Sequence, residues 1–140
     1  MKAQILVNAL LKLFPVVLFF SSGFSHVTGD PVSISIFTKM HWEPVGRYII
    51  GALELAVGFL MILPGRSLEA GIVGTLMGLG MVGAHAMVLG TDLDGDGGWR
   101  FSLALVLLAS CMGLVIVHRK EIPDLPRRLA ALRKTKIKMP

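Results

Sequence analysis

The sequence predicts an all-α integral membrane protein: a bundle of four membrane-spanning helices with both ends in the cytoplasm. Apolar residues fill 54% of its 140 positions, charged residues fill only 16%, and the mean hydropathy is +0.71. A soluble domain carries about a quarter charged residues, so this composition favours a membrane environment. The single cysteine, Cys111, leaves no partner in the chain for a disulfide, a CxxC pair or a structural zinc site.

Four segments are long enough to cross a bilayer. A span needs about 20 mostly apolar residues to cross about 30 Å of hydrocarbon. The segments are residues 5–25, 45–63, 70–89 and 99–117. Turn residues separate the later ones, with Pro-Gly-Arg-Ser at 64–67 and an Asp- and Gly-rich stretch at 92–98. We therefore predict one membrane domain, residues 1–118, and a basic tail, residues 119–140.

The flanking Lys and Arg residues predict the orientation. Four spans put both ends on one side, and that side has most of the basic residues, including the cluster within residues 119–138. The opposite side has only Lys39, Arg47 and Arg100. Both ends are therefore expected in the cytoplasm. Lys12 lies inside the first span, where its long stem can reach the headgroups.

The first segment has an alternative interpretation as a cleaved signal peptide. Lys2 precedes an apolar run that ends in the small residues Ser-Ser-Gly at 21–23. However, Asn8 and Lys12 interrupt the apolar region that such a signal needs, and cleavage would leave three spans. A membrane span is the preferred interpretation.

The longer external connection covers residues 24–44. Within it, residues 32–36 (Val-Ser-Ile-Ser-Ile) alternate between apolar and polar, which predicts a strand or a segment lying on the bilayer. Trp42, Tyr48 and Trp99 fall near the predicted external boundaries, where amphipathic rings anchor helices at the headgroups.

A carboxyl group inside the second span is the first candidate for function. A charge near a helix centre costs about 2.5 to 3.5 kcal/mol on insertion scales, so Glu54 needs a partner. Gly51 and Gly58 share the helix face of Glu54, and small residues let a neighbouring helix approach closely.

The third span has a matching stripe, made of Gly71, Gly74, Gly78 and His85. We expect the two glycine faces to pack on each other. Glu54 and His85 would then meet, directly or through water, in a polar pocket in the outer half of the bilayer. Three interpretations of Glu54 stay open: it fixes helix register, it binds a polar ligand, proton or quinone head group, or it snorkels.

No metal site is predicted. Asp92, Asp94, Asp96 and Gly97 reproduce the first half of an EF-hand loop, but Leu103 occupies the twelfth position, where a bidentate Glu is required. The acidic loop is therefore interpreted as a solvated external turn. One His and one carboxylate in the spans are too few for a transition metal, and the external His26 and His41 add no recognised ligand spacing.

The pattern of apolar and basic residues in the tail predicts a short amphipathic segment. Pro123 and Pro126 end the last helix, and Leu125, Leu129 and Leu132 then share one face. The basic residues around them are Arg127, Arg128, Arg133, Lys134, Lys136 and Lys138. We expect this segment to lie on anionic headgroups, as a topology determinant or as a docking arm for a protein. Because the positive charge sits in a tail and not on a folded face, nucleic acid is not a predicted partner.

Four motifs keep their order and spacing along the spans. They are FFSSGFSHV at residues 19–27, GALEL at 51–55, Ala-His at 84–85 and Asp-Gly-Gly at 96–98. Together, over residues 11–117, they resemble the DoxX family of small four-span bacterial membrane proteins. The resemblance implies a multi-pass protein of the bacterial cytoplasmic membrane, with Glu54 and His85 at the positions of the family's intramembrane Glu and His. His26 stands where a Lys is more usual in the family, which weakens any role for it that the resemblance implies.

The resemblance also implies a quinone-linked or oxidative-stress-associated membrane subunit, but without a cysteine pair for dithiol chemistry in this chain. In that interpretation protonated Glu54 donates to a carbonyl oxygen and His85 exchanges the proton with the external side. The alternative is a noncatalytic scaffold that recruits a cytoplasmic partner through its tail, and a small-molecule carrier is a third. Expected partners are the bilayer, anionic headgroups, and redox-complex subunits or a second copy. No catalytic residue is assigned, and a quinone is the expected cofactor only through the resemblance.

Overall fold

The computed structural model describes residues 2–128 and 130, with side chains from residue 6 onward. Four long helices form the bundle: α1 (Lys2–Thr28), α3 (Val45–Ile62), α4 (Ser67–Ala84) and α5 (Trp99–Val117). The π-helical turn η1 (His85–Leu89) continues α4. All four are long and apolar enough to cross a membrane, which confirms the predicted spans. Helix α1 runs three residues further than predicted, to Thr28, and α4 starts earlier, at Ser67.

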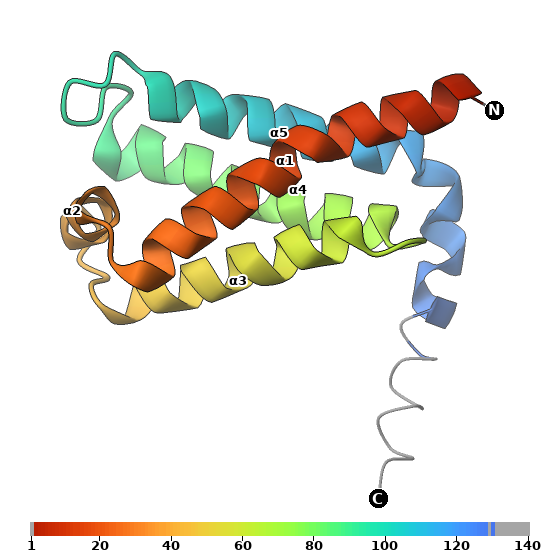
Figure 1. Cartoon of the computed structure of the whole chain (residues 1–140), viewed down its shortest axis with the longest axis horizontal. Coiled ribbons are helices and arrows are strands. Elements are labelled where there is room, and N and C mark those ends of the chain that lie inside the picture. Colours follow the sequence, from red (N-terminus) through yellow and green to blue (C-terminus); the bar gives the residue numbers. More distant parts are fainter. Residues whose placement is uncertain (1, 129, 131–140) are drawn as a thin grey trace, which may run out of the picture.

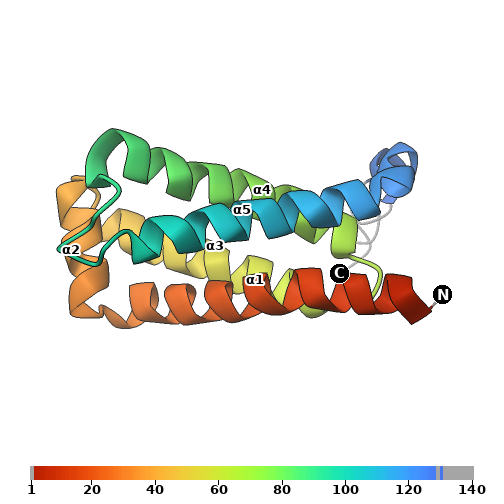
Figure 2. The ribbon, with the colours of Figure 1, turned by 90° about the horizontal axis from the view of Figure 1, so that it is seen from above.

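Two short helices lie at opposite ends of the bundle (Figures 1 and 2). Helix α2 (Pro31–Lys39) lies across one end, and the 3-10 helix η2 (Arg119–Asp124) lies at the other. We call these the α2 end and the η2 end. The start of α1 is at the η2 end, as is η2 itself, so both ends of the described chain lie on the same side of the bundle (Figure 1). This placement agrees with an even number of spans.

Helix α2 replaces the strand that the alternating residues 32–36 predicted, so the strand prediction was wrong. The carboxylate of Asp30 accepts hydrogen bonds from the backbone N–H groups of Val32 at 3.1 Å and Ser33 at 3.3 Å. Pro31 occupies the first helical position, where its missing N–H costs nothing. An Asp-Pro start is a helix signal, and it outweighs a period-two pattern over five residues. Ser33 and Phe37, four residues apart, are the buried face of this helix.

The glycine faces of α3 and α4 do not pack on each other as predicted. A Cβ atom added to Gly51 on α3 would lie 2.8 Å from Cβ of His26 and 3.1 Å from the carbonyl oxygen of Gly23, both on α1. A Cβ atom added to Gly74 on α4 would lie 2.7 Å from Sγ of Cys111 on α5. The small face of α3 therefore packs against α1, and the small face of α4 packs against α5. The sequence shows that a face is small but not which helix fills it.

The apolar core lies in the half of the bundle nearer η2. Its fully buried members come from all four long helices and are Phe19, Met61, Ala70, Leu107, Cys111 and Leu114. Large apolar side chains on the outer surface are exposed, including Phe59 at 59% and Leu76 at 64%. An apolar exterior around a packed interior suits a bundle that lipid tails surround.

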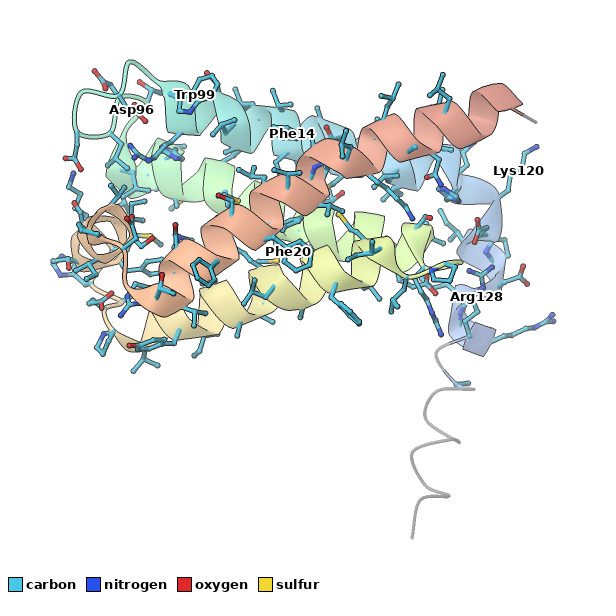
Figure 3. The ribbon with its side chains drawn as sticks, in the orientation of Figure 1. Phe14, Phe20, Asp96, Trp99, Lys120 and Arg128 are labelled. Atoms are coloured by element: carbon cyan, nitrogen blue, oxygen red, sulfur yellow. The ribbon has the colours of Figure 1, made fainter. Side chains whose placement is uncertain are left out.

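A polar cluster fastens α1 to the end of α5 at the η2 end. Nδ1 of His118 lies 2.7 Å from Oε1 of Glu121, and its Nε2 lies 3.0 Å from Oδ1 of Asn8. Arg128 donates to Oε2 of Glu121 at 2.8 Å and Arg66 donates to Glu69 at 3.1 Å. Figure 3 shows Lys120 and Arg128 at this end and Asp96 and Trp99 at the other.

Most of the predicted amphipathic tail lies outside the described residues, including Leu129, Leu132, Arg133, Lys134, Lys136 and Lys138. Within the described part, the chain is helical from Leu125 to Arg128. The three predicted anchor aromatics, Trp42, Tyr48 and Trp99, are all at least half exposed and lie at or near the α2 end of the bundle.

Candidate functional site

A cavity of about 800 Å³ occupies the half of the bundle nearer α2. The cavity is lined by side chains from α1, α2, α3, α4, η1 and α5. Helix α2 covers it at the end of the bundle. This volume falls within the range of small-molecule sites, and the lining is mainly apolar with a few polar groups. The polar members include Ser22, Ser25, His26, Glu54 and His85. Glu54 and His85, the two residues of the predicted polar pocket, both line this cavity.

Glu54 on α3 is paired with His26 on α1. Nδ1 of His26 lies 2.8 Å from Oε2 of Glu54, and Glu54 is fully buried. This hydrogen bond gives the buried carboxyl a polar partner inside the bundle. A hydrogen-bonded carboxyl costs far less inside a bilayer than an isolated carboxylate. The partner that Glu54 requires is thus on α1, and not on α4 as predicted.

His85 lines the same cavity but has a partner of its own. Its Nδ1 donates to the carbonyl oxygen of Gly90 at 2.8 Å, and the backbone N–H of Gly90 donates to the carbonyl oxygen of His85 at 2.8 Å. Gly90 has φ +76°, a left-handed conformation that glycine adopts without strain. This double contact closes η1. In a neutral imidazole whose Nδ1 carries the hydrogen, Nε2 is an acceptor. Glu54 and His85 make no direct hydrogen bond to each other, although both border one cavity.

His26 is the cavity residue whose pairing with Glu54 the sequence analysis does not predict. A local signal was nevertheless present, because Gly23 and His26 on α1 have the same three-residue spacing as Gly51 and Glu54 on α3. In two antiparallel helices with this spacing, the glycine of each helix lies opposite the ionisable residue of the other, which brings the two polar groups together. The ring of Phe37 from α2 packs edge-on against His26, with the centroids 5.1 Å apart.

A buried arginine holds the backbone next to His26. Arg47 on α3 is 4% exposed, and its guanidinium donates to the carbonyl oxygen of His26. The Nε of Arg47 also donates to both carboxylate oxygens of Glu43, at 2.9 and 3.0 Å. Gly29, with φ +78°, ends α1 beside this guanidinium. A charge-assisted hydrogen bond at the last turn of α1 thereby fixes the position of His26 relative to α3.

The acidic loop uses its carboxylates to shape itself. Asp96 accepts hydrogen bonds from the backbone N–H groups of Leu93, Gly98 and Arg100, and these bonds hold its pKa below the ordinary value. Asp94 pairs with Lys39 of α2 at 2.5 Å, and this lysine holds the pKa of Asp94 below its usual value. Asp92 accepts from the backbone N–H of Gly97. The loop thus fastens α2 to the start of α5.

The part of the chain that the structure describes contains no group of three His, Cys, Asp or Glu residues that could hold a metal ion. Comparisons of the chain with protein-family models, with curated proteins and with solved structures found no match. Geometry alone therefore carries the functional argument. The site offers a hydrogen-bonded His–Glu pair, a second imidazole and several hydroxyls within a mainly apolar cavity.

Proposed function

We propose that this chain is a multi-pass membrane protein that binds a small, largely apolar molecule with a polar head group in the cavity under α2. One observation carries the proposal. Glu54 lines the cavity, and its Oε1 is buried and has no hydrogen-bond partner among the described residues. An unpartnered buried acceptor is costly, and a ligand head group bound at this oxygen would remove that cost.

A quinone-like head group matches this chemistry, and the resemblance to the DoxX family points to the same class. When Nδ1 of His26 donates to Oε2, a protonated Glu54 presents its hydrogen from Oε1 and donates it to a quinone carbonyl oxygen. An ionised Glu54 instead accepts from a hydroquinone hydroxyl at the same oxygen. One carboxyl oxygen thus serves both forms of the ring. The proposed role is that of a redox-associated membrane subunit whose electron carriers reside in partner subunits.

The proposed orientation puts the η2 end in the cytoplasm of a bacterial cell and the α2 end outside the cytoplasmic membrane. Basic residues at the η2 end support it, among them Arg66, Arg119, Lys120 and Arg128. In this orientation the tail lies on anionic headgroups, and the cavity lies in the outer half of the bilayer.

The test is a binding titration of the purified chain in lipid nanodiscs with decylbenzoquinone, comparing wild type with Glu54→Leu. Glu69→Leu is the matched control, because Glu69 is also a buried carboxyl with an unpartnered oxygen but does not line the cavity. We expect Glu54→Leu to weaken binding by at least about tenfold, equivalent to about 1.4 kcal/mol, and Glu69→Leu to leave it within about twofold. Equal binding by wild type and Glu54→Leu would overturn the proposal.

The alternative function is a noncatalytic scaffold. The glycine faces of α3 and α4 are covered by α1 and α5 of the same chain, so they are not available to bind a partner protein. A scaffold would therefore dock its partner through the tail. Native mass spectrometry of the protein from its own membrane separates the two functions. A small molecule that is lost with Glu54→Leu supports the cavity, whereas a protein that is retained with Glu54→Leu and lost on removal of residues 127–140 supports the scaffold.

A further inference from the structure

Two pairs of helices, α1 with α3 and α4 with α5, approach each other so closely that they close the wall of the cavity on two sides. A Cβ atom added to Gly23 on α1 would lie 3.0 Å from the carbonyl oxygen of Gly51 on α3. A Cβ atom added to Gly78 on α4 would lie 3.1 Å from Cα of Leu108 on α5. Helix α2 covers one end, where Phe37 is 3% exposed, and the core covers the other, where Met61 is fully buried. The remaining flanks are those between α3 and α4 and between α1 and α5.

The two remaining flanks differ in how polar they are. The lining that α1 and α5 contribute mixes the polar Ser21, Ser25 and Arg100 with the apolar Leu18 and Leu103. The lining from α3 and α4 includes Ile50, Leu53, Val73, Leu76 and Gly80, and we call these five residues the α3–α4 flank. Leu53 is 47% exposed and Leu76 is 64% exposed although both line the cavity. A Cβ atom added to Gly80 would meet nothing within 4 Å.

We propose that the α3–α4 flank is open to the bilayer and holds the apolar chain of the ligand, so that the ligand is a chain-bearing amphiphile and not a compact polar molecule. This inference rests on the proposed function and names its ligand class. The flank is continuous with the space beside Glu54, and side chains that line a cavity while exposed to lipid let an apolar chain run from that space into the hydrocarbon. The apolar chain of the ligand meets apolar surroundings both in the flank and among the lipid tails, so passing from one to the other costs little free energy.

Gly80 offers a direct test, because a leucine there fills the flank without a clash to the backbone. Gly83→Leu is the matched control: it lies on the same helix and its Cβ also meets nothing within 4 Å, but it does not line the cavity. Two probes with the same ring are titrated in nanodiscs, tetramethylbenzoquinone and its decyl-bearing analogue. Each probe is compared with itself across wild type, Gly80→Leu and Gly83→Leu, which cancels its partitioning into lipid.

We expect Gly80→Leu to weaken binding of the decyl-bearing probe by about tenfold and to leave tetramethylbenzoquinone within about twofold, while Gly83→Leu changes neither. Unchanged binding of both probes by Gly80→Leu overturns the open flank but leaves the cavity as a binding site. Equal losses for both probes also overturn it, because the substitution then acts on the head group. If wild type binds neither probe, the proposed function itself fails.

Discussion

The imidazole of His26 and the carboxyl of Glu54 lie 2.8 Å apart, between the antiparallel helices α1 and α3. Each helix sets a glycine against the other's polar residue, because Gly51 faces Cβ of His26 and Gly23 faces Cβ of Glu54. The close approach of the glycines and the pairing of the polar groups depend on each other. Larger residues at the glycine positions would separate α1 from α3 and lengthen the hydrogen bond. The contact between the backbones therefore sets the chemistry of the cavity wall.

Loss of the imidazole should destabilise the bundle more than loss of both partners. His26→Ala leaves both oxygens of the buried Glu54 without a side-chain partner, which costs about 1 to 3 kcal/mol in the free energy of unfolding. The double variant His26→Ala with Glu54→Leu should recover most of that loss, since no buried polar group then remains unpaired. Unfolding titrations in mixed detergent micelles measure both, and additive losses in the double variant would contradict the pairing.

Gly51→Ala should destabilise the protein through overpacking. The new methyl group would lie 2.8 Å from Cβ of His26 and 3.1 Å from the carbonyl oxygen of Gly23, neither of which is the end of a flexible side chain. The expected loss in the free energy of unfolding is about 1 to 3 kcal/mol. Gly83→Ala has open space at the same position and should be neutral or slightly stabilising. The same unfolding titrations compare the two variants, and an equal effect would show that α1 and α3 pack less closely than described.

The contact between α2 and the acidic loop should weaken in acid. Lys39 lowers the pKa of Asp94, so the stabilisation from this pair is complete above the ordinary carboxyl pKa of about 3.9. It is lost as the pH falls through the lowered pKa of the folded state. Carboxyl carbon shifts in an NMR titration report the pKa of Asp94 directly. Lys39→Met should raise that pKa toward the ordinary value, and an unchanged pKa in this variant would rule out the pair.

The orientation can be measured with cysteines placed at the two ends. Thr91→Cys lies in the exposed loop at the α2 end, and Lys120→Cys is exposed at the η2 end, whereas the native Cys111 is fully buried. We expect a membrane-impermeant maleimide to label Thr91→Cys on intact spheroplasts and to label Lys120→Cys only after permeabilisation. Wild type, with Cys111 alone, is the control for background labelling. The reverse pattern would place the η2 end outside.

The bundle could be predicted from the sequence because a bilayer requires each span to satisfy its own backbone hydrogen bonds. About 20 apolar residues between turn signals can then form only a helix. The four spans and the small faces that contain Gly51 and Gly74 follow from such local rules. Glu54 and His85 do border one cavity, but the packing of the α3 and α4 glycine faces, on which that prediction rested, does not form. Helix α2 was within reach of the same rules, since Asp30 and Pro31 mark its start.

The pairing of the helices was decided only by the tertiary structure. The faces that contain Gly51 and Gly74 are equally small, so either could have accepted the other, and the choice depends on how well whole side-chain surfaces fit. The fit of α1 on α3 brings His26 to Glu54, whereas Gly90 takes Nδ1 of His85. The sequence by itself determined that a buried carboxyl needs a partner, because an unpaired charge is costly in the bilayer. Which imidazole supplies that partner is a property of packing, which a single sequence does not display.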